Sequence, residues 1–314
     1  MRYFLEKVLF FTFYNIVLYY ILSLLTENNH ELKNNYMAAI IDKHARINEI
    51  SKPKIIFAGG SNLAFGINSP EIENKFNMPV VNLGLHAGLG LSFILKELKS
   101  SLRSKDIVFL SIEYLISSEG DYKLQNQTSG FYKKANDFYD RSLPKDMALH
   151  VEQTRNNIKV IFDTFKSKNK LKEEQMVIYN RKGFNRNGDL ISHLEKIRYT
   201  EWNENILKYR YWEGIGELNN FYDYAMSKNI KIFFMYPNYP ASEFKKNEIT
   251  ISRYANDLSK DLKIPIINKP SDFVLDDSLF FDTAYHLTKQ GRQKRTCILI
   301  DLLIKRQRTK GEWQ

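Results

Sequence analysis

The sequence predicts an α/β protein in which helices cover both faces of a mostly parallel sheet. Short apolar runs alternate with segments of helical periodicity, and the run 106–112 (DIVFLSI) is almost continuously apolar. Parallel strands that are covered on both faces have this composition. Strands separated by helices of this length form βαβ units, so we expect a three-layer α/β/α sandwich.

The strands and helices of this sandwich can be assigned in chain order. Ser69 and Pro70 are typical of a helix start, with Ser69 as the N-cap and Pro70 at the first helical position. Thr288 is the expected cap of the last helix. The expected strands are 55–58, 79–83, 106–112, 230–236 and 264–267, and the expected later helices are 91–100, 218–227, 249–262 and 288–305.

An uncharged apolar run near the start predicts a membrane anchor. The run 8–25 (VLFFTFYNIVLYYILSLL) would span roughly 27 Å as a helix, which is enough for a bilayer core. No small-residue cleavage site follows, so we expect an uncleaved anchor over residues 1–25, with a buried core helix as the alternative. Arg2 and Lys7 precede the run, and Glu27 and Glu31 follow it. The positive-inside rule then predicts a cytoplasmic amino terminus and an extracytoplasmic body.

The remaining chain divides by composition. Residues 26–50 are polar and are expected to form a juxtamembrane stalk, and 307–314 form a basic tail. The α/β domain covers 51–306, with its core in 51–116 and 217–306. The segment 117–216 is rich in Lys, Asn, Asp and aromatic residues, and we expect a helical insertion that caps the carboxyl ends of the strands, where open parallel sheets bind ligands. Its aromatic residues, Tyr211 and Trp212 among them, either stack on sugars or pack the cap onto the core.

Composition excludes several classes of function. The net charge of +10 is scattered and no basic-aromatic motif accompanies it, so we expect a solvated basic surface and no nucleic-acid partner. Cys297 is the only cysteine, which excludes an internal disulfide and a thiolate zinc cluster. Neither paired histidines at helical spacing nor a GxGxxG motif is present. We therefore expect no metal and no cofactor.

Two short motifs carry residues that are suited to nucleophilic catalysis. Ser61 lies in IIFAGGSNLAFG, directly after the first strand and a Gly-Gly turn that allows close approach of a ligand. Asp282 and His286 lie in FFDTAYHLTKQG, in the loop before the last helix. Both loops are expected at the carboxyl edge of the sheet. A serine nucleophile needs an imidazole base and a carboxylate that orients it, so these three residues are a candidate catalytic set.

These motifs resemble those of the SGNH/GDSL hydrolases. GGSNLAFG, then VVNLG with LHAGLG, and DTAYHL before a helix are similar to the membrane-anchored bacterial branch, which includes DltD-type and polysaccharide O-acyl-modifying proteins. The resemblance covers 51–116 and 217–306 and implies a flavodoxin-like sandwich. It also implies Ser61 as nucleophile, His286 as base and Asp282 as its orienting partner. The N–H of Gly84 would join that of Ser61 in an oxyanion hole.

The sequence departs from the family pattern in three places. Gly60 stands where the family has a turn-forming Asp, and Asp282 lies four residues before His286 instead of three, so Asp276 and Asp277 are alternatives for the third member. The third departure removes a side-chain donor, because the third strand ends in SIEY where the family has an oxyanion-hole Asn.

Glu113, in SIEY, cannot donate a hydrogen bond unless it is protonated. Asn62, Asn82 or His86 are possible replacements, and the sequence does not choose among them. Glu113 would otherwise bind a substrate hydroxyl or amine, contact the basic insertion, or pair with a nearby Lys or Arg.

These observations predict a membrane-anchored, extracytoplasmic serine esterase or acyltransferase. Its substrate would be an acyl ester of a cell-surface polysaccharide or related polymer, with acetyl as the expected acyl group, attacked through a Ser acyl-enzyme. The expected partners are the acylated carbohydrate or envelope polymer, the membrane through the amino-terminal helix, and an integral-membrane acyl donor. The alternative is a non-catalytic scaffold of envelope polysaccharide assembly with a degenerate hydrolase site.

Overall fold

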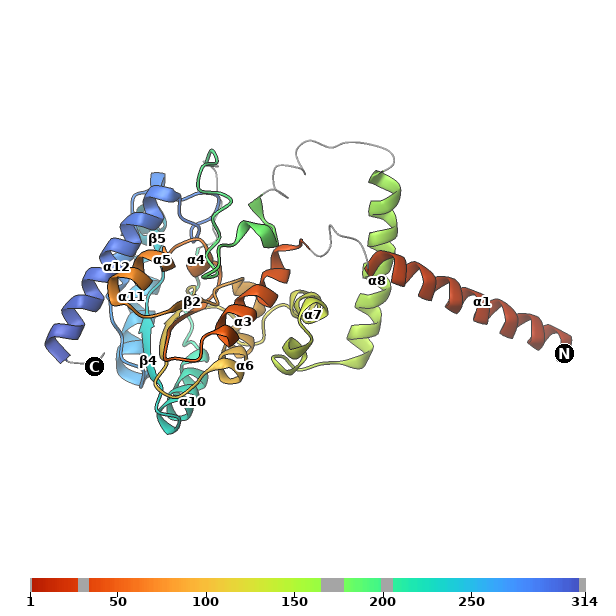
Figure 1. Cartoon of the computed structure of the whole chain (residues 1–314), viewed down its shortest axis with the longest axis horizontal. Helices are drawn as coiled ribbons and strands as arrows, with labels where there is room; N and C mark the ends of the chain where they lie inside the picture. Colours follow the sequence, from red (N-terminus) through yellow and green to blue (C-terminus); the bar gives the residue numbers. More distant parts are fainter. Residues whose placement is uncertain (1, 28–33, 165–177, 199–205, 311–314) are drawn as a thin grey trace.

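A computed structural model describes residues 2–27, 34–164, 178–198 and 206–310 (Figure 1). Its centre is a four-stranded sheet in the order β2-β1-β3-β4, and every neighbouring pair is parallel. The prediction of an α/β fold with a parallel sheet is therefore confirmed. The strands are β1 (Ile55–Gly59), β2 (Val80–Asn82), β3 (Ile107–Ser111) and β4 (Lys231–Met235).

The expected fifth strand at 264–267 is reduced to an isolated parallel bridge between Phe234 and Ile266. The amide of Phe234 donates to the carbonyl of Pro265 over 3.0 Å, and that of Ile267 donates to Phe234 over 2.9 Å. Pro265 has no N–H to extend the ladder, so a longer strand does not form here. A small second sheet, which the sequence did not predict, pairs β5 (Tyr239–Pro240) with β6 (Val274–Leu275).

Helices cover both faces of the central sheet. Alternate side chains of the strands point to opposite faces, so Phe57 and Phe109 pack on one side and Ile56 and Val108 on the other. The first side is covered by α5 (Ser69–Phe76) and α12 (Lys289–Lys310), and the second by α6 (Leu91–Ser101), α10 (Gly214–Ser227) and α11 (Ala241–Asp261).

The helix ends differ from the predictions in detail. Asn68 occupies the N-cap position of α5, and Ser69 is the first residue of the helix. The backbone N–H and the hydroxyl of Ser69 both donate to the carboxylate of Asp189, at 2.9 and 2.5 Å. Helices α10 and α11 begin at Gly214 and Ala241, earlier than the periodicity indicated. Thr288 caps α12 as predicted, since its Oγ1 accepts from the amide of Gly291 at 3.2 Å.

Residues 34–50 pack against the α/β domain, which corrects the expectation of a stalk. This segment forms η1 (Tyr36–Ala38) and α3 (Ala39–Glu49), and Ile40 and Ile47 are fully buried. Lys43 is buried as well, with its ammonium donating to the carbonyls of Asn82 (2.9 Å) and Gly188 (2.5 Å). Burial lowers the pKa of Lys43 to about 7.

The insertion contributes a second apolar cluster and part of the main core. Phe138 and Tyr139 pack against residues of η1 and α3, whereas Trp212 lies in the main core with its indole N–H on the carbonyl of Ile116 at 2.8 Å. Trp212 is completely buried, so the idea that it stacks on sugars is wrong. The described parts of the insertion contain the helices α7 (Tyr122–Phe131), η3 (Lys133–Asp137), α8 (Leu143–Thr164) and η4 (Arg181–Gly183).

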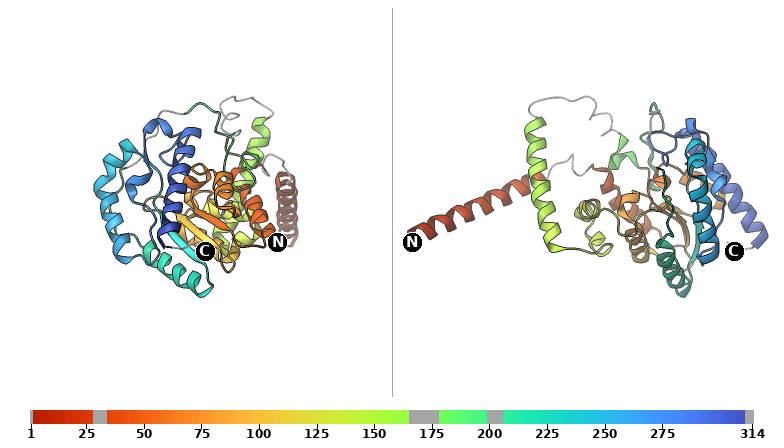
Figure 2. Two further views of the ribbon diagram at one scale, coloured as in Figure 1. Left: turned by 60° about the vertical axis from the view of Figure 1, so that its left-hand side comes forward. Right: turned by 180° about the vertical axis from the view of Figure 1, so that it is seen from behind.

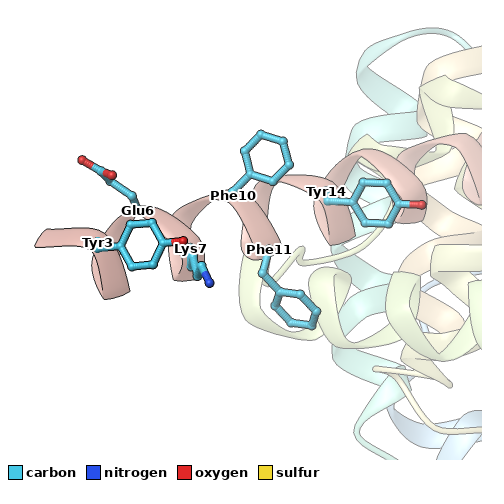
Figure 3. A pocket seen from close by; sticks show the side chains of 6 residues that line it. All are labelled: Tyr3, Glu6, Lys7, Phe10, Phe11 and Tyr14. Carbon is cyan, nitrogen blue, oxygen red and sulfur yellow. The ribbon is translucent and has the colours of Figure 1, made fainter. Parts of the chain in front are cut away.

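Helix α1 (Arg2–Glu27) projects away from the globular part (Figures 1 and 2). Its stretch Tyr3–Ile21 is long and apolar enough to cross a membrane, and none of it is buried within the protein. Figure 3 shows Tyr3, Phe10 and Tyr14 among the side chains that surround a shallow hollow on this lone helix. Such an exposed apolar surface suits contact with lipid.

Candidate active site

Ser61 lies at the turn that follows β1. It is the first residue of the short helix α4 (Ser61–Ala64) and is half-buried. A Cβ on Gly59 would overlap the carbonyl oxygen of Ser111, and one on Gly60 would overlap the carboxyl group of Glu113. The two glycines are therefore required by the close approach of the end of β3 to this turn.

The turn after β1 lies at the topological switch point of the sheet, where strands on its two sides are reached by connections on opposite faces. β1 pairs with β2 on one side and β3 on the other, so Ser61 and Glu113 leave neighbouring strands at the same edge. The connection from β1 to β2 contains α5, and the connection from β2 to β3 contains α6, on opposite faces. Ligands of open α/β sheets bind in the crevice at such a position.

Asp282 and His286 form a hydrogen-bonded pair in the loop before α12. The Nδ1 of His286 lies 2.8 Å from Oδ1 of Asp282. The imidazole stacks face to face on Phe65, with ring centroids 3.7 Å apart and planes 3° apart. The amide of Phe65 in turn donates to the carbonyl of Ser61 at 3.0 Å. The imidazole therefore lies against the helical turn that begins at Ser61.

The serine hydroxyl and the imidazole are not hydrogen-bonded to each other. Within the part of the chain that the structure describes, Ser61 Oγ has no hydrogen-bond partner. Hydrogen bonds between a nucleophile and its base are often long in free enzymes and tighten when substrate binds.

Tyr179, from the insertion, completes the environment of the pair. Its hydroxyl donates to Oδ2 of Asp282 and lies 3.2 Å from Nδ1 of His286. The sequence analysis did not find this residue, because nothing in IYNRKGFN marks a tyrosine as functional. The only available signal was the expectation that the insertion covers the carboxyl ends of the strands.

The hydrogen bonds fix the protonation of the pair. Burial alone would raise the pKa of Asp282, but the hydrogen bond and charge of His286 and the hydroxyl of Tyr179 together lower it below its usual value. Asp282 is therefore an acceptor for both neighbours. With Nδ1 donating to Asp282, the Nε2 of His286 is left with the lone pair that a general base needs.

His193, from the insertion, packs on the same Phe65 ring as His286. Its ring lies 4.7 Å from that of Phe65, and its Nε2 donates to the carbonyl of Leu287 at 2.9 Å. Burial lowers the pKa of His193 to about 4, so the ring is neutral. It supports the backbone next to His286.

Glu113 is buried beside the serine turn. Its Oε1 accepts from the amide of Asn62 at 3.0 Å, and its Oε2 is buried without a hydrogen-bond partner. Burial raises the pKa of Glu113, an effect that the hydrogen bonds from Asn62 oppose but do not cancel. Within the described residues, Glu113 forms no direct ion pair with a Lys or Arg. Of the alternatives for Glu113, pairing with a nearby Lys or Arg is therefore not found among the described residues.

Asn62 and Asn82 do not present free donors. The side-chain Nδ2 of Asn62 donates to the carbonyl of Ser111 at 3.0 Å. The Nδ2 of Asn82 donates to the carbonyl of Leu63 and to Oδ1 of Asp189, both at 2.9 Å. Both side chains are fully buried. These two candidates for the oxyanion hole instead hold the turns together.

The N–H of Gly84 is also engaged, since it donates to Oδ1 of Asn82 at 2.9 Å. In this state of the protein it does not point to an open oxyanion position as the resemblance implied. The N–H of Ser61, by contrast, has no partner within the described residues.

His86 remains as a neutral donor. It is exposed, and its Nδ1 accepts from the amide of Gly88 at 2.9 Å, which leaves the proton on Nε2. Although the residue as a whole is exposed, protein atoms around the ring partly desolvate it, and this desolvation, followed by the charge of the nearby His286, lowers the pKa of His86.

Asp189 connects the insertion to the site. One carboxylate accepts from Ser69, Asn82 and the guanidinium of Arg292, the last at 2.9 Å. The amide of Leu190 next to it donates to the carbonyl of Ala64 in α4 at 2.8 Å. The segment 178–198 that carries Tyr179 is thereby attached to the carboxyl edge of the sheet.

The spare carboxylates Asp276 and Asp277 have other contacts. Asp276 accepts from the amide of Ser278, and Asp277 accepts from that of Ser242. The structure therefore selects Asp282 as the partner of His286.

The described residues contain no group of three or more His, Cys, Asp or Glu side chains that could hold a metal ion. No family model matches the sequence, and no curated protein matches it.

Proposed function

We propose that this protein is a membrane-anchored serine esterase or acyltransferase of the SGNH type. Its substrate would be an acyl ester of a carbohydrate polymer outside the cytoplasm. The observation that carries the proposal is the Asp282–His286 pair, stacked on the helical turn that begins at Ser61. An oriented imidazole beside a serine on a strand-to-helix turn is the arrangement that activates a hydroxyl.

The reaction would proceed through an acyl-enzyme. Ser61 Oγ attacks the acyl carbonyl as its proton passes to Nε2 of His286, and the ester C–O bond breaks as that proton passes to the departing alcohol. Water or a sugar hydroxyl then gives its proton to Nε2 and attacks the acyl carbon, and the bond between the acyl carbon and Ser61 Oγ breaks as that proton passes from Nε2 to Oγ. Asp282 stabilises the imidazolium that forms in each step.

The oxyanion that develops on the acyl oxygen needs donors, and three candidates have no partner among the described residues. They are the N–H of Ser61, the Nε2–H of His86 and, if the carboxyl is protonated, Oε2 of Glu113. We assign to neutral Glu113 the role that an Asn has in the resembling family. A carboxylic acid that is kept neutral by an apolar site can donate in this way.

The second candidate function is a scaffold of envelope polysaccharide assembly. The occupied N–H of Gly84 favours it, because a relic site has no need of an open oxyanion hole. A relic would bind acylated polymer without turning it over.

A serine-directed probe separates the two functions. The full-length protein in detergent is treated with a fluorophosphonate, and the labelled peptide is identified by mass spectrometry. The esterase proposal expects labelling of Ser61 that Ser61→Ala and His286→Gln abolish. The control is Ser104→Ala, which removes an exposed serine from the loop before β3 and must leave labelling unchanged. A folded wild type that stays unlabelled would favour the scaffold.

The proposed orientation has its own test. Cys297 is exposed on α12, so a membrane-impermeant maleimide should label it in intact cells. Labelling that requires permeabilised cells would place the domain in the cytoplasm.

A further inference from the structure

Helix α8 carries an exposed apolar stripe. Leu143, Met147 and Val151 are 73%, 65% and 58% exposed. They are spaced four residues apart, so they follow one side of the helix. An uninterrupted row of this kind is unusual on a surface that faces water.

The same side of α8 meets the helix that can cross a membrane. The hydroxyl of Tyr19 in α1 lies 3.1 Å from Oγ1 of Thr154, and its ring packs edge-on against His150 at 5.8 Å. At 3.6 residues per turn, the two contacts and the apolar stripe fall within an arc of about 100°. The stripe is therefore continuous with the α1 contact.

The contact lies near one end of the apolar stretch of α1. That stretch covers Tyr3–Ile21, so Tyr19 is at the level where a spanning helix leaves the bilayer. In Figures 1 and 2, α8 runs across α1 and lies between it and the globular part. No other described helix stands so close to α1 in these views.

Outside this arc, α8 is attached to the rest of the protein by polar contacts. Asp146 accepts from the hydroxyl of Tyr122 at 2.6 Å and from Asn126 at 2.8 Å, and Glu152 pairs with Lys123 at 2.6 Å. All three partners are in α7. The rest of the protein thus contacts α8 outside the apolar stripe, and the stripe itself is left exposed.

We infer that α8 lies in the membrane–water interface, with Leu143, Met147 and Val151 inserted at the boundary of headgroups and acyl chains. The occupant of the stripe is the lipid bilayer itself. An amphipathic helix in this position buries its apolar side about 5–10 Å into the boundary. The α/β domain would then be held at the membrane by two elements, one that spans it and one that lies on it. This inference does not depend on the proposed catalytic function.

Depth-dependent fluorescence quenching tests the inference. The full chain, with Cys297→Ser as background, is placed in phosphatidylcholine nanodiscs that contain lipid with a nitroxide on the acyl chain. An environment-sensitive dye is attached after Met147→Cys, and separately after Tyr14→Cys within the span. Both dyes should lose emission to the nitroxide. Dyes attached after Lys145→Cys, on the other side of α8, and after Met226→Cys, on α10, should not.

The possible results decide the question. Quenching at 14 and 147 but not at 145 or 226 supports the interfacial position of α8. Emission at 147 that persists as it does at 226 overturns the interfacial position. Energy transfer between copies labelled at 147 also overturns it, because it would mean that a second copy of the chain covers the stripe. Thermal unfolding of each labelled protein verifies its fold, and Val151→Cys replaces Met147→Cys if that variant unfolds early.

Discussion

Arg295 holds Asn62, the residue that follows the proposed nucleophile, by both its backbone and its side chain. The guanidinium donates to the carbonyl of Asn62 at 2.7 Å and to its Oδ1 at 3.1 Å. The amide of the same residue donates to Glu113. The serine turn is thus held by a buried cation from α12 and by a buried carboxyl that follows β3. Burial lowers the pKa of Arg295, and the charge of Glu113 opposes that effect.

Removal of this cation should destabilise the protein. Arg295→Met leaves the carbonyl of Asn62 and the Oδ1 of Asn238 without a donor. We expect the free energy of unfolding to fall by roughly 3 kcal/mol, the range for an orphaned buried polar contact with a charged group. Urea unfolding measures it. Arg308→Met, at an exposed position of the same helix, should change stability by less than about 0.5 kcal/mol. Equal effects of both variants would contradict the role of Arg295.

Glu113→Gln tests whether the carboxyl is neutral in the folded protein. Burial raises the folded-state pKa of Glu113. The stability that neutral Glu113 contributes is therefore present below the unfolded-state pKa, and it is lost as the pH rises through the folded-state pKa. Gln does not titrate. The stability of Glu113→Gln relative to wild type should therefore increase as the pH rises above about 4.

The same variant should keep activity, since a Gln amide can still donate to an oxyanion and its oxygen can still accept from Asn62. Turnover of 4-nitrophenyl acetate within about tenfold of wild type is the expected result, whereas loss of one oxyanion donor costs about 10²–10³. Inactivity of a folded Glu113→Gln protein would mean that the charged carboxylate is the working form.

Tyr179→Phe tests a positioning residue. The change removes the hydroxyl that donates to Asp282 and keeps the ring. A hydrogen bond to a charged group contributes about 1.5–3 kcal/mol, so kcat should fall about ten- to hundredfold with little change in KM. The acidic limb of the pH–rate profile should also move, because the basicity of the pair depends on this contact. Tyr209→Phe, at an exposed hydroxyl bound to Asp257, is the matched control. A shift in KM alone would argue for a role in binding.

Asp282→Asn tests the acid range of stability. The folded-state pKa of Asp282 is lowered, so its contribution is present above the unfolded-state pKa and is lost as the pH falls through the folded-state value. Wild type should exceed Asp282→Asn in stability at neutral pH, and the difference should shrink below about pH 4. A difference that stays constant with pH would show that the contacts with His286 and Tyr179 do not lower the pKa of Asp282.

The sequence allowed the sheet and the three residues of the proposed catalytic set to be predicted for a common reason. Apolar runs mark parallel strands, and loops after such strands share one edge, so Ser61 and the loop of Asp282 and His286 could be placed together without knowledge of packing. The exception is 264–267, where the apolar run is genuine but Pro265 limits it to a bridge.

Long-range contacts could not be predicted in this way. Residues 34–50 have the polar composition of a stalk, yet the ammonium of Lys43 is satisfied by two carbonyls in the interior. Tyr179 and His193 reach the site through an insertion without periodicity. Asn62 and Asn82 hold the turns together through hydrogen bonds with Arg295 and Asp189, and these partners are far from them in sequence.

The contacts of Asp189 have a consequence for when the site can exist. Its carboxylate gathers Ser69, Asn82 and Arg292, and the residues that act together in the proposed chemistry lie in the same widely separated segments. Of the proposed triad of Ser61, Asp282 and His286, the chain before residue 282 contains only the serine. If the proposed function and orientation hold, the unfolded chain would cross the membrane with Ser61 still apart from its proposed base, and the two would meet only after the loop that precedes α12 has reached the sheet edge.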